Sequence, residues 1–340
     1  MATAKQQSRV PVMDEKLLGN REQIIILKAS KLHGCIFSPW KFDPTEDEFS
    51  AESSIFQDTA EFSFSKEQSE VFTGWRRADS LLTNAGLTDA IQADLVQDLN
   101  SDCSLVTSFC VELARVQRLG PVNGSMILST LYPRKRPSPN GKYVVKLYFN
   151  GSFRKVVIDD RLPNSTSDRS LYVVDRNNPN NIWPALIEKA YLKVRGGYDF
   201  PGSNSGLDLS ILIGWIPEQI ILRIHDTPPE NLWQRIFKAF NYGDVLITSG
   251  TPKMTELEEE DLGLTGQHNY AVLDMKQERS RQFMLVKNPW SGGRVYQGFN
   301  YGFESENEDE SNTKRYVTFA IHRVTIMQSQ SHLYELHHSG

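Results

Sequence analysis

Two segments of the chain carry apolar residues at the spacing of an α-helix. In residues 100–119 they recur every three to four positions, and Ser101 or Asp102 can cap the first turn. In residues 183–195 the same repeat follows Pro184, whose missing N–H costs nothing in a first turn. The positions that define the two faces are Leu105, Val106, Phe109, Leu113 and Val116 in the first segment, and Trp183, Leu186, Ile187, Ala190, Tyr191 and Val194 in the second.

Other segments have the composition of strands. Residues 142–162 contain two β-rich runs around Asn150-Gly151, the dipeptide that most strongly indicates a β-hairpin. Later in the chain, a predicted helix at 229–240 precedes three predicted strands, at 244–249, 269–275 and 282–287. The first half of the chain is therefore led by helices and the second half by strands.

The remaining segments have weaker patterns, and there is no internal repeat. Residues 22–34 favour a short strand or helix, and residues 66–84 favour a short helix. The Gly- and Ser-rich residues 196–206 indicate either a boundary between lobes or a shaped loop. The acidic runs at 256–261 and 304–310 are most simply solvated loops, although the first could also act as a gate before His268.

Composition limits the class of protein. The 340 residues suffice for two lobes, and 39% hydrophobic with 23% charged residues is typical of a globular chain. A net charge of −5 argues against nucleic acid as a partner. We expect no membrane span, because no apolar run reaches 18 residues, and no secretory signal at the N-terminus. Three cysteines, an odd and low number, favour a reducing compartment and therefore a cytoplasmic protein.

Cys103 is the candidate nucleophile among the three cysteines. It lies at the first turn of the predicted helix, where unpaired N–H groups and the helix dipole favour a thiolate. Cys110 lies two turns further along, where a buried structural thiol is the simpler interpretation, and Cys35 has no comparable position.

His268 is the candidate base, since it follows a glycine-containing turn and precedes a predicted strand; alone, it would more simply be a surface histidine. If strands 269–275 and 282–287 form a hairpin centred near residue 278, His268 faces Asn288. The Asn288 oxygen would then accept the Nδ1 proton of His268 and leave Nε2 facing the thiol. The same register opposes Tyr270 to Val286 and Val272 to Met284.

Two further residues complete the predicted site. Gln97 lies six residues before Cys103, so its amide N–H and the Cys103 backbone N–H could stabilise an oxyanion. Trp290 follows Asn288 and could keep water from the histidine–asparagine bond, although a core tryptophan is the simpler interpretation.

Five segments of the chain, in order, resemble the calpain family of cysteine proteases. They are LVQDLNSDCSLVTSF, KVVIDDRLP, WPALIEKAYLKVRGGYDF, GLTGQHNYAVLDM and VKNPWSGG, spread over roughly residues 90–295. The spellings YFNGSFRKVVIDDRLP and GWIPEQI look like the PalB-type branch, which lacks a calcium-binding EF-hand domain. The resemblance implies Cys103 as nucleophile, His268 as base, Asn288 as its orienting residue and Gln97 as oxyanion donor.

The resemblance also implies an α+β fold, namely a two-lobed papain-like core with the active-site cleft between the lobes. We expect an N-terminal extension over 1–65, a helical lobe over 66–205 with Cys103, a β-rich lobe over 206–330 with His268 and Asn288, and a polar tail over 331–340. Residues 296–340 fit the family pattern poorly, which leaves open whether the second lobe is complete.

Calcium and partners follow from the same resemblance. No cofactor is required, but one core calcium site of conventional calpains uses an aspartate at the position of Asp94, with Glu188 as a candidate partner. The second site has acidic residues where this chain has Arg294 and Tyr301. The implied partners are protein substrates and, for the PalB-type branch, the ESCRT machinery on endosomes, with a role in ambient-pH signalling.

Two other functions remain open. The chain could be a non-catalytic scaffold that keeps the calpain fold and binds partners through the cleft. It could also be a different Cys-His enzyme, such as a transglutaminase or amidase, but those usually use aspartate where this chain has Asn288.

Overall fold

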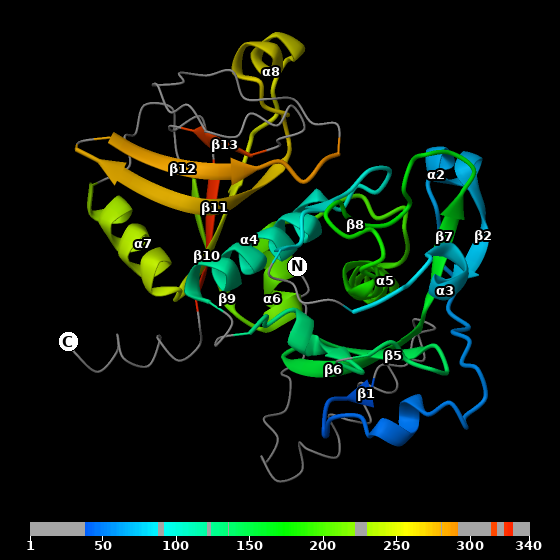
Figure 1. Cartoon of the computed structure of the whole chain (residues 1–340). Helices are drawn as coiled ribbons and strands as arrows, with labels where there is room; N and C mark the ends of the chain where they lie inside the picture. The colour runs from blue at the N-terminus through cyan, green and yellow to red at the C-terminus, as the bar shows by residue number, and fades with distance from the viewer. Residues whose placement is uncertain are drawn as a thin grey trace, which may run out of the picture.

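The computed structural model has an α+β fold in which helices pack against several antiparallel sheets (Figure 1). It describes residues 38–87, 92–120, 124–134, 136–221, 230–279, 281–291, 314–317 and 323–328. The predicted element at 22–34, the acidic run at 304–310 and the predicted tail at 331–340 lie outside these ranges. In the part that is described, no helix is long and apolar enough to cross a bilayer.

The helices and strands have the following bounds. The helices are α2 (Lys66–Val71), α3 (Ala78–Leu81), α4 (Cys103–Leu119), α5 (Trp183–Arg195), α6 (Ser205–Ile213), α7 (Glu230–Tyr242) and α8 (Glu256–Leu262), with 3-10 turns η1 (Glu46–Phe49) and η4 (Leu128–Thr130). The strands are β1 (Ser38–Pro39), β2 (Phe72–Arg77), β3 (Leu95–Val96), β4 (Leu131–Tyr132), β5 (Lys142–Phe149), β6 (Ser152–Asp159), β7 (Arg161–Ser165), β8 (Val174–Asp175), β9 (Ile216–Ile221), β10 (Val245–Gly250), β11 (Asn269–Glu278), β12 (Arg281–Lys287), β13 (Lys314–Val317) and β14 (Arg323–Gln328).

The predicted hairpin forms the centre of a four-stranded sheet with the order β1-β6-β5-β4. Phe149 pairs with Ser152, so Asn150 and Gly151 alone make the turn between β5 and β6. Both turn residues have positive φ, 52° and 73°, as a two-residue hairpin turn requires. The hairpin prediction is confirmed.

A six-stranded sheet with the order β13-β12-β11-β10-β14-β9 contains the three strands predicted in the second half. β14, from near the end of the chain, pairs with β10 on one side and with β9 on the other. α7 packs on this sheet, with Trp233 and Ile236 in one buried cluster with Ile247 and Val272. Residues beyond 296 therefore contribute two strands to the sheet.

α4 lies between this sheet and the rest of the molecule (Figure 1). It contacts β10 and β11 as well as α6, and all five apolar residues predicted for its inner face are buried. Thr107 Oγ1 donates a hydrogen bond of 3.1 Å to the backbone oxygen of Asn269. This bond fixes the first turns of α4 against the start of β11.

Two predicted elements are corrected by the structure. Residues 66–84 do not form one helix, because β2 separates α2 from α3 and pairs with β7. The acidic run 256–261 is not a loop but belongs to α8. Thr255 Oγ1 accepts from the Glu258 backbone N–H, while the Glu258 carboxylate accepts from the Thr255 N–H, which together make a capping box. This Thr-x-x-Glu signal was present in the sequence.

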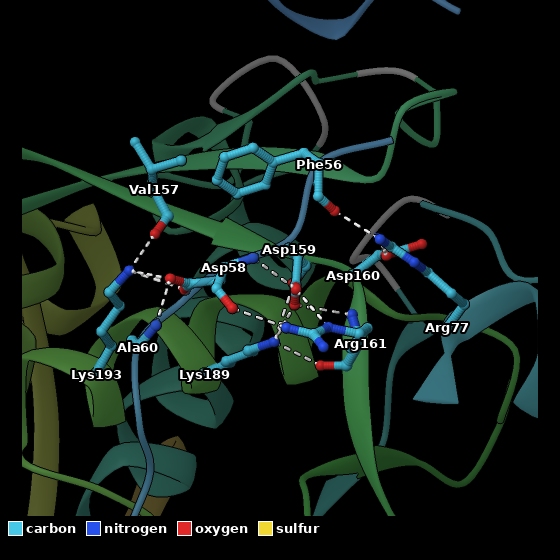
Figure 2. Close-up of polar contacts among 10 residues, drawn as sticks. All are labelled: Phe56, Asp58, Ala60, Arg77, Val157, Asp159, Asp160, Arg161, Lys189 and Lys193. Atoms are coloured by element: carbon cyan, nitrogen blue, oxygen red, sulfur yellow. Dashed lines mark hydrogen bonds and ion pairs between the residues drawn. The ribbon is translucent and has the colours of Figure 1, made fainter. Parts of the chain in front are cut away.

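A network of buried charges fixes the segment before α2 to the hairpin and α5 (Figure 2). Lys193 Nζ donates to both carboxylate oxygens of Asp58 at 2.8 Å. Lys189 and Arg161 both pair with Asp159, which is fully buried. Since each buried carboxylate has a cationic partner, the desolvation of these charges is compensated.

Candidate active site

Cys103 is the first residue of α4, as the sequence predicts, and it is partly exposed. Its Sγ accepts one side-chain hydrogen bond, from Asn269 Nδ2 at 3.7 Å. Among the described residues, His268 makes no hydrogen bond to this sulfur. Burial raises the pKa of the Cys103 thiol, and hydrogen bonds from Asn269 and the Ser104 backbone oppose that increase.

His268 and Asn288 are in contact. The two atoms His268 Nε2 and Asn288 Oδ1 lie 2.8 Å apart, and both side chains are almost completely buried. Burial lowers the pKa of His268 to about 4, and the bond to Asn288 opposes this decrease. At neutral pH the imidazole and the thiol are thus both uncharged in this arrangement.

The register that led to this pair was nevertheless wrong. Val272 pairs with Val286 and not with Met284, so the hairpin is displaced by two residues. The ladder also shifts at an irregularity between Val272 and Asp274. At Val272 the displacement of two positions keeps the side chains on their predicted face of the sheet, because side chains alternate with a period of two, whereas from Asp274 onward the displacement is three positions.

The assignment of the ring nitrogens was wrong as well. We predicted that Nδ1 of His268 would face Asn288, but Nε2 does. Nδ1 is therefore the ring nitrogen that does not face Asn288. The Asn288 oxygen also accepts the Trp290 backbone N–H at 3.0 Å, which fixes the amide in the orientation that faces the imidazole.

Trp290 covers the histidine from one side. Its ring centroid lies 4.5 Å from that of His268, while the ring of Tyr270 lies at 5.0 Å and perpendicular to the imidazole. Trp290 keeps 39% of its surface exposed, so it separates the histidine from solvent and is not a core residue.

Gln97 is buried beside residues 289–291, and its side-chain amide already donates a hydrogen bond. Its Nε2 donates to the backbone oxygen of Asn100 at 2.6 Å. Its backbone N–H donates to the backbone oxygen of Pro289 at 2.8 Å, and its backbone oxygen accepts from the Ser291 N–H at 3.1 Å. These two backbone bonds join the residue predicted to stabilise the oxyanion to the segment that carries Asn288.

A buried ion pair reinforces the same junction. Lys287, the last residue of β12, pairs with Asp94, whose other oxygen accepts from Arg176 Nε at 2.8 Å. Burial alone would raise the pKa of Asp94, but Lys287 and Arg176 hold it below its usual value. Residues 94–97 and 287–291 are therefore connected by charge as well as by backbone hydrogen bonds.

Asp94 and Glu188 were also the candidate calcium ligands, and their surroundings fit this ion poorly. Asp94 already neutralises two cations. Glu188 is fully buried and accepts from Asn100 Nδ2 at 2.8 Å and from the Val173 N–H at 2.9 Å. Ca²⁺ instead requires six to eight oxygen ligands. In the described ranges no group of three or more His, Cys, Asp or Glu side chains could hold a metal ion. Arg294 and Tyr301 lie outside those ranges.

The carboxyl group of Asp102, the residue before Cys103, is fully buried. It has no exposed surface and lies beside the carboxyl group of Glu188. Burial raises its pKa to about 6, and burial together with the charge of Asp102 raises the pKa of Glu188 well above its usual value. The two carboxyl groups thus disfavour simultaneous ionisation.

Known proteins resemble this chain over most of its length. The model of the calpain family cysteine protease matches residues 45–315. The chain belongs to the calpain family. It is 45% identical to the calpain-like protease palB/RIM13 of Aspergillus oryzae, over 96% of this chain and 40% of that protein. It is 48% identical to the calpain-like protease palB/cpr-8 of Neurospora crassa, over 87% of this chain and 33% of that protein. It is 37% identical to human calpain-7, over 79% of this chain and 34% of that protein.

This calpain-family chain spans about two fifths or less of the length of these relatives. Two residues of the site were missed by the sequence analysis, Asn269 and Lys287. Each directly neighbours a predicted site residue. A polar residue within the apolar strand NYAVLDM and a lysine at the end of QFMLVK were the signals that could have identified them.

Proposed function

We propose that this chain is the protease core of a calpain-like cysteine endopeptidase with a Cys103–His268–Asn288 triad. The observation that carries the proposal is the 2.8 Å contact between His268 and Asn288 in a chain whose candidate nucleophile begins α4. An asparagine that holds an imidazole in one tautomer leaves its other nitrogen ready to exchange a proton with a thiol. Residues 66–205 and 206–330 would form the two papain-like lobes, with the cleft between them.

The reaction would proceed by acyl transfer. His268 Nδ1 takes the Cys103 proton, and the thiolate attacks the carbonyl carbon of the peptide bond. The Cys103 backbone N–H and the Gln97 amide donate to the oxyanion that forms. His268 then gives its proton to the leaving amine, and the carbon–nitrogen bond breaks to leave a thioester. Water, deprotonated by His268, hydrolyses the thioester and restores the thiol.

The contacts described above correspond to a resting arrangement. The Gln97 side chain donates to Asn100. The Cys103 sulfur accepts a hydrogen bond from Asn269 and, among the described residues, none from His268. A neutral thiol and a neutral imidazole must also become a thiolate and an imidazolium. We infer that His268 approaches Cys103 and that one N–H of Gln97 turns toward the substrate before chemistry begins.

The biological role is proposed from the relatives. Its substrates would be intracellular proteins that undergo limited proteolysis, and by its similarity to PalB-type proteins the chain would act in ambient-pH signalling. A cytoplasmic protein recruited to endosomes through ESCRT-associated partners is consistent with that role. Calcium would not be required, since Asp94 is neutralised by Lys287 and Arg176.

Peptide hydrolysis by three variants tests the proposal. Cys103→Ser and His268→Ala should abolish turnover, and Gln97→Ala should lower kcat by roughly 10²–10³ if its amide stabilises the oxyanion. Cys110→Ala is the matched control, because this buried thiol on the same helix should not affect turnover. Full activity of the Cys103→Ser variant would exclude a thiol protease.

The scaffold remains the second candidate, favoured by the uncharged state of His268 and Cys103 in this arrangement. An epoxide inhibitor of the papain type distinguishes the two functions. In a protease core the epoxide should alkylate the Cys103 thiol, and His268→Ala should slow this alkylation. A folded chain that never reacts at Cys103 and never cleaves peptides would be a scaffold.

A further inference from the structure

Asn269 is the one side chain that donates a hydrogen bond to the sulfur of Cys103 in the described part of the chain. It is the first residue of β11 and follows His268 directly. Its amide is held from both ends, since Nδ2 lies 3.7 Å from Sγ while Oδ1 accepts from Ser205 Oγ at 3.5 Å.

The backbone around Asn269 keeps the amide in place. Its carbonyl oxygen accepts from Thr107 on α4, and Ser205 on α6 is bonded to Thr248 on β10 at 2.6 Å. Three elements that surround the nucleophile therefore fix one amide with its N–H groups toward the sulfur. A donor held in this way stabilises the charged form of its acceptor more than the neutral form.

We propose that Asn269 is a further catalytic residue, which stabilises the Cys103 thiolate through its side-chain N–H while His268 is not bonded to the sulfur. The proposal rests on the proposed function of Cys103 as nucleophile. In the resting arrangement the imidazole of His268 is uncharged and does not stabilise a thiolate at Cys103, so another group has to do so. Asn269 is the group that lets part of the thiol ionise before His268 approaches.

The charges around the sulfur make such a donor necessary. Asp102 precedes Cys103 and its charge opposes the thiolate. α6 contributes Asp208, a buried carboxyl group that acts on Asp102. Tyr270 of β11 and His268, just before this strand, are both uncharged near neutral pH. The groups that favour the thiolate are N–H donors, namely Asn269 and the Ser104 backbone.

The pH dependence of alkylation tests this role without a peptide substrate. Iodoacetamide is added to the folded chain at a series of pH values, and modification of Cys103 is followed by peptide mass. Asn269→Leu keeps the size of the side chain but removes the donor. It should move the midpoint of the rate profile up by about one pH unit, and slow the reaction about tenfold at pH 7. The rate at high pH, where both thiols are ionised, should be unchanged.

A second variant and a control complete the experiment. Asn269→Asp keeps the shape and the acceptor for Ser205, so it guards against misfolding of the leucine variant, and its charge should raise the midpoint further. Thr107→Val removes the other bond between α4 and the same residue, without touching the sulfur, and should keep the wild-type midpoint.

The outcomes separate this proposal from the proposed function. Wild-type midpoints in both Asn269 variants, or a lower rate at every pH with no shift, would overturn the role of Asn269 and leave the triad intact. A wild-type chain whose Cys103 is never alkylated would instead count against the protease itself. Near-ultraviolet circular dichroism establishes that each variant is folded.

Discussion

The ion pair between Asp94 and Lys287 leads to an asymmetric prediction for stability. Lys287 has 3% of its side chain exposed and, among the described residues, Asp94 as its anionic partner. Asp94 has 16% exposed and a second cationic partner, Arg176, at 2.8 Å. Removal of the aspartate therefore leaves a buried cation unpaired, whereas removal of the lysine leaves the carboxylate paired.

The magnitudes follow from this difference. Loss of one partner from a buried pair costs roughly 3–5 kcal/mol, so Asp94→Leu should lower the free energy of unfolding by about that amount. Lys287→Met retains the Arg176 bond and should cost only about 1–2 kcal/mol. The double variant should be more stable than Asp94→Leu alone, because it contains no unpaired lysine.

Urea denaturation of the four proteins at pH 7 measures these values, with an unchanged dependence on urea as the sign that the unfolding reaction is the same. The double-mutant cycle then isolates the energy of the pair. The reasoning would be refuted if Lys287→Met proved as costly as Asp94→Leu, or if the two effects simply added. Either result would mean that the pair does not hold residues 94–97 against 287–291.

Two further predictions concern pH. The pKa of His268 is lowered from 6.5 to about 4 in the folded chain. As the pH falls, this histidine is therefore protonated in the unfolded chain before it is protonated in the folded one. His268 should therefore cost about 3 kcal/mol of stability between pH 6.5 and pH 4, and His268→Gln should remove that dependence in urea titrations. A difference between the two proteins that is constant with pH would contradict this. Burial raises the pKa of Glu112 to about 7, so its contribution to stability is complete below pH 4.5 and is lost as the pH rises through 7. Relative to the unchanged chain, Glu112→Gln should thus be more stabilising at pH 8 than at pH 4 by about 3 kcal/mol. If the substitution shifts the midpoint of thermal unfolding equally at the two pH values, this mechanism is excluded.

Elements that depend on neighbouring residues could be predicted from the sequence. The apolar repeats of α4 and α5 and the Asn150-Gly151 turn are local patterns, and each element appears within a few residues of its predicted bounds. Two elements that were predicted wrongly also depend on local patterns. A capping box at Thr255 and the strand between α2 and α3 were missed, because acidic composition and short length outweighed the patterns.

The sequence by itself determined the family and the residue types of the site, because the five calpain-like segments fix which side chains are present and in what order. Only the tertiary structure decided how those side chains meet. The displaced ladder of β11 and β12, the choice of Nε2 as the partner of Asn288, and the bonds of Asn269 and Lys287 all join residues far apart in the chain. Such contacts depend on how α4 packs against β11 and on which strands share a sheet, and no local periodicity encodes that packing.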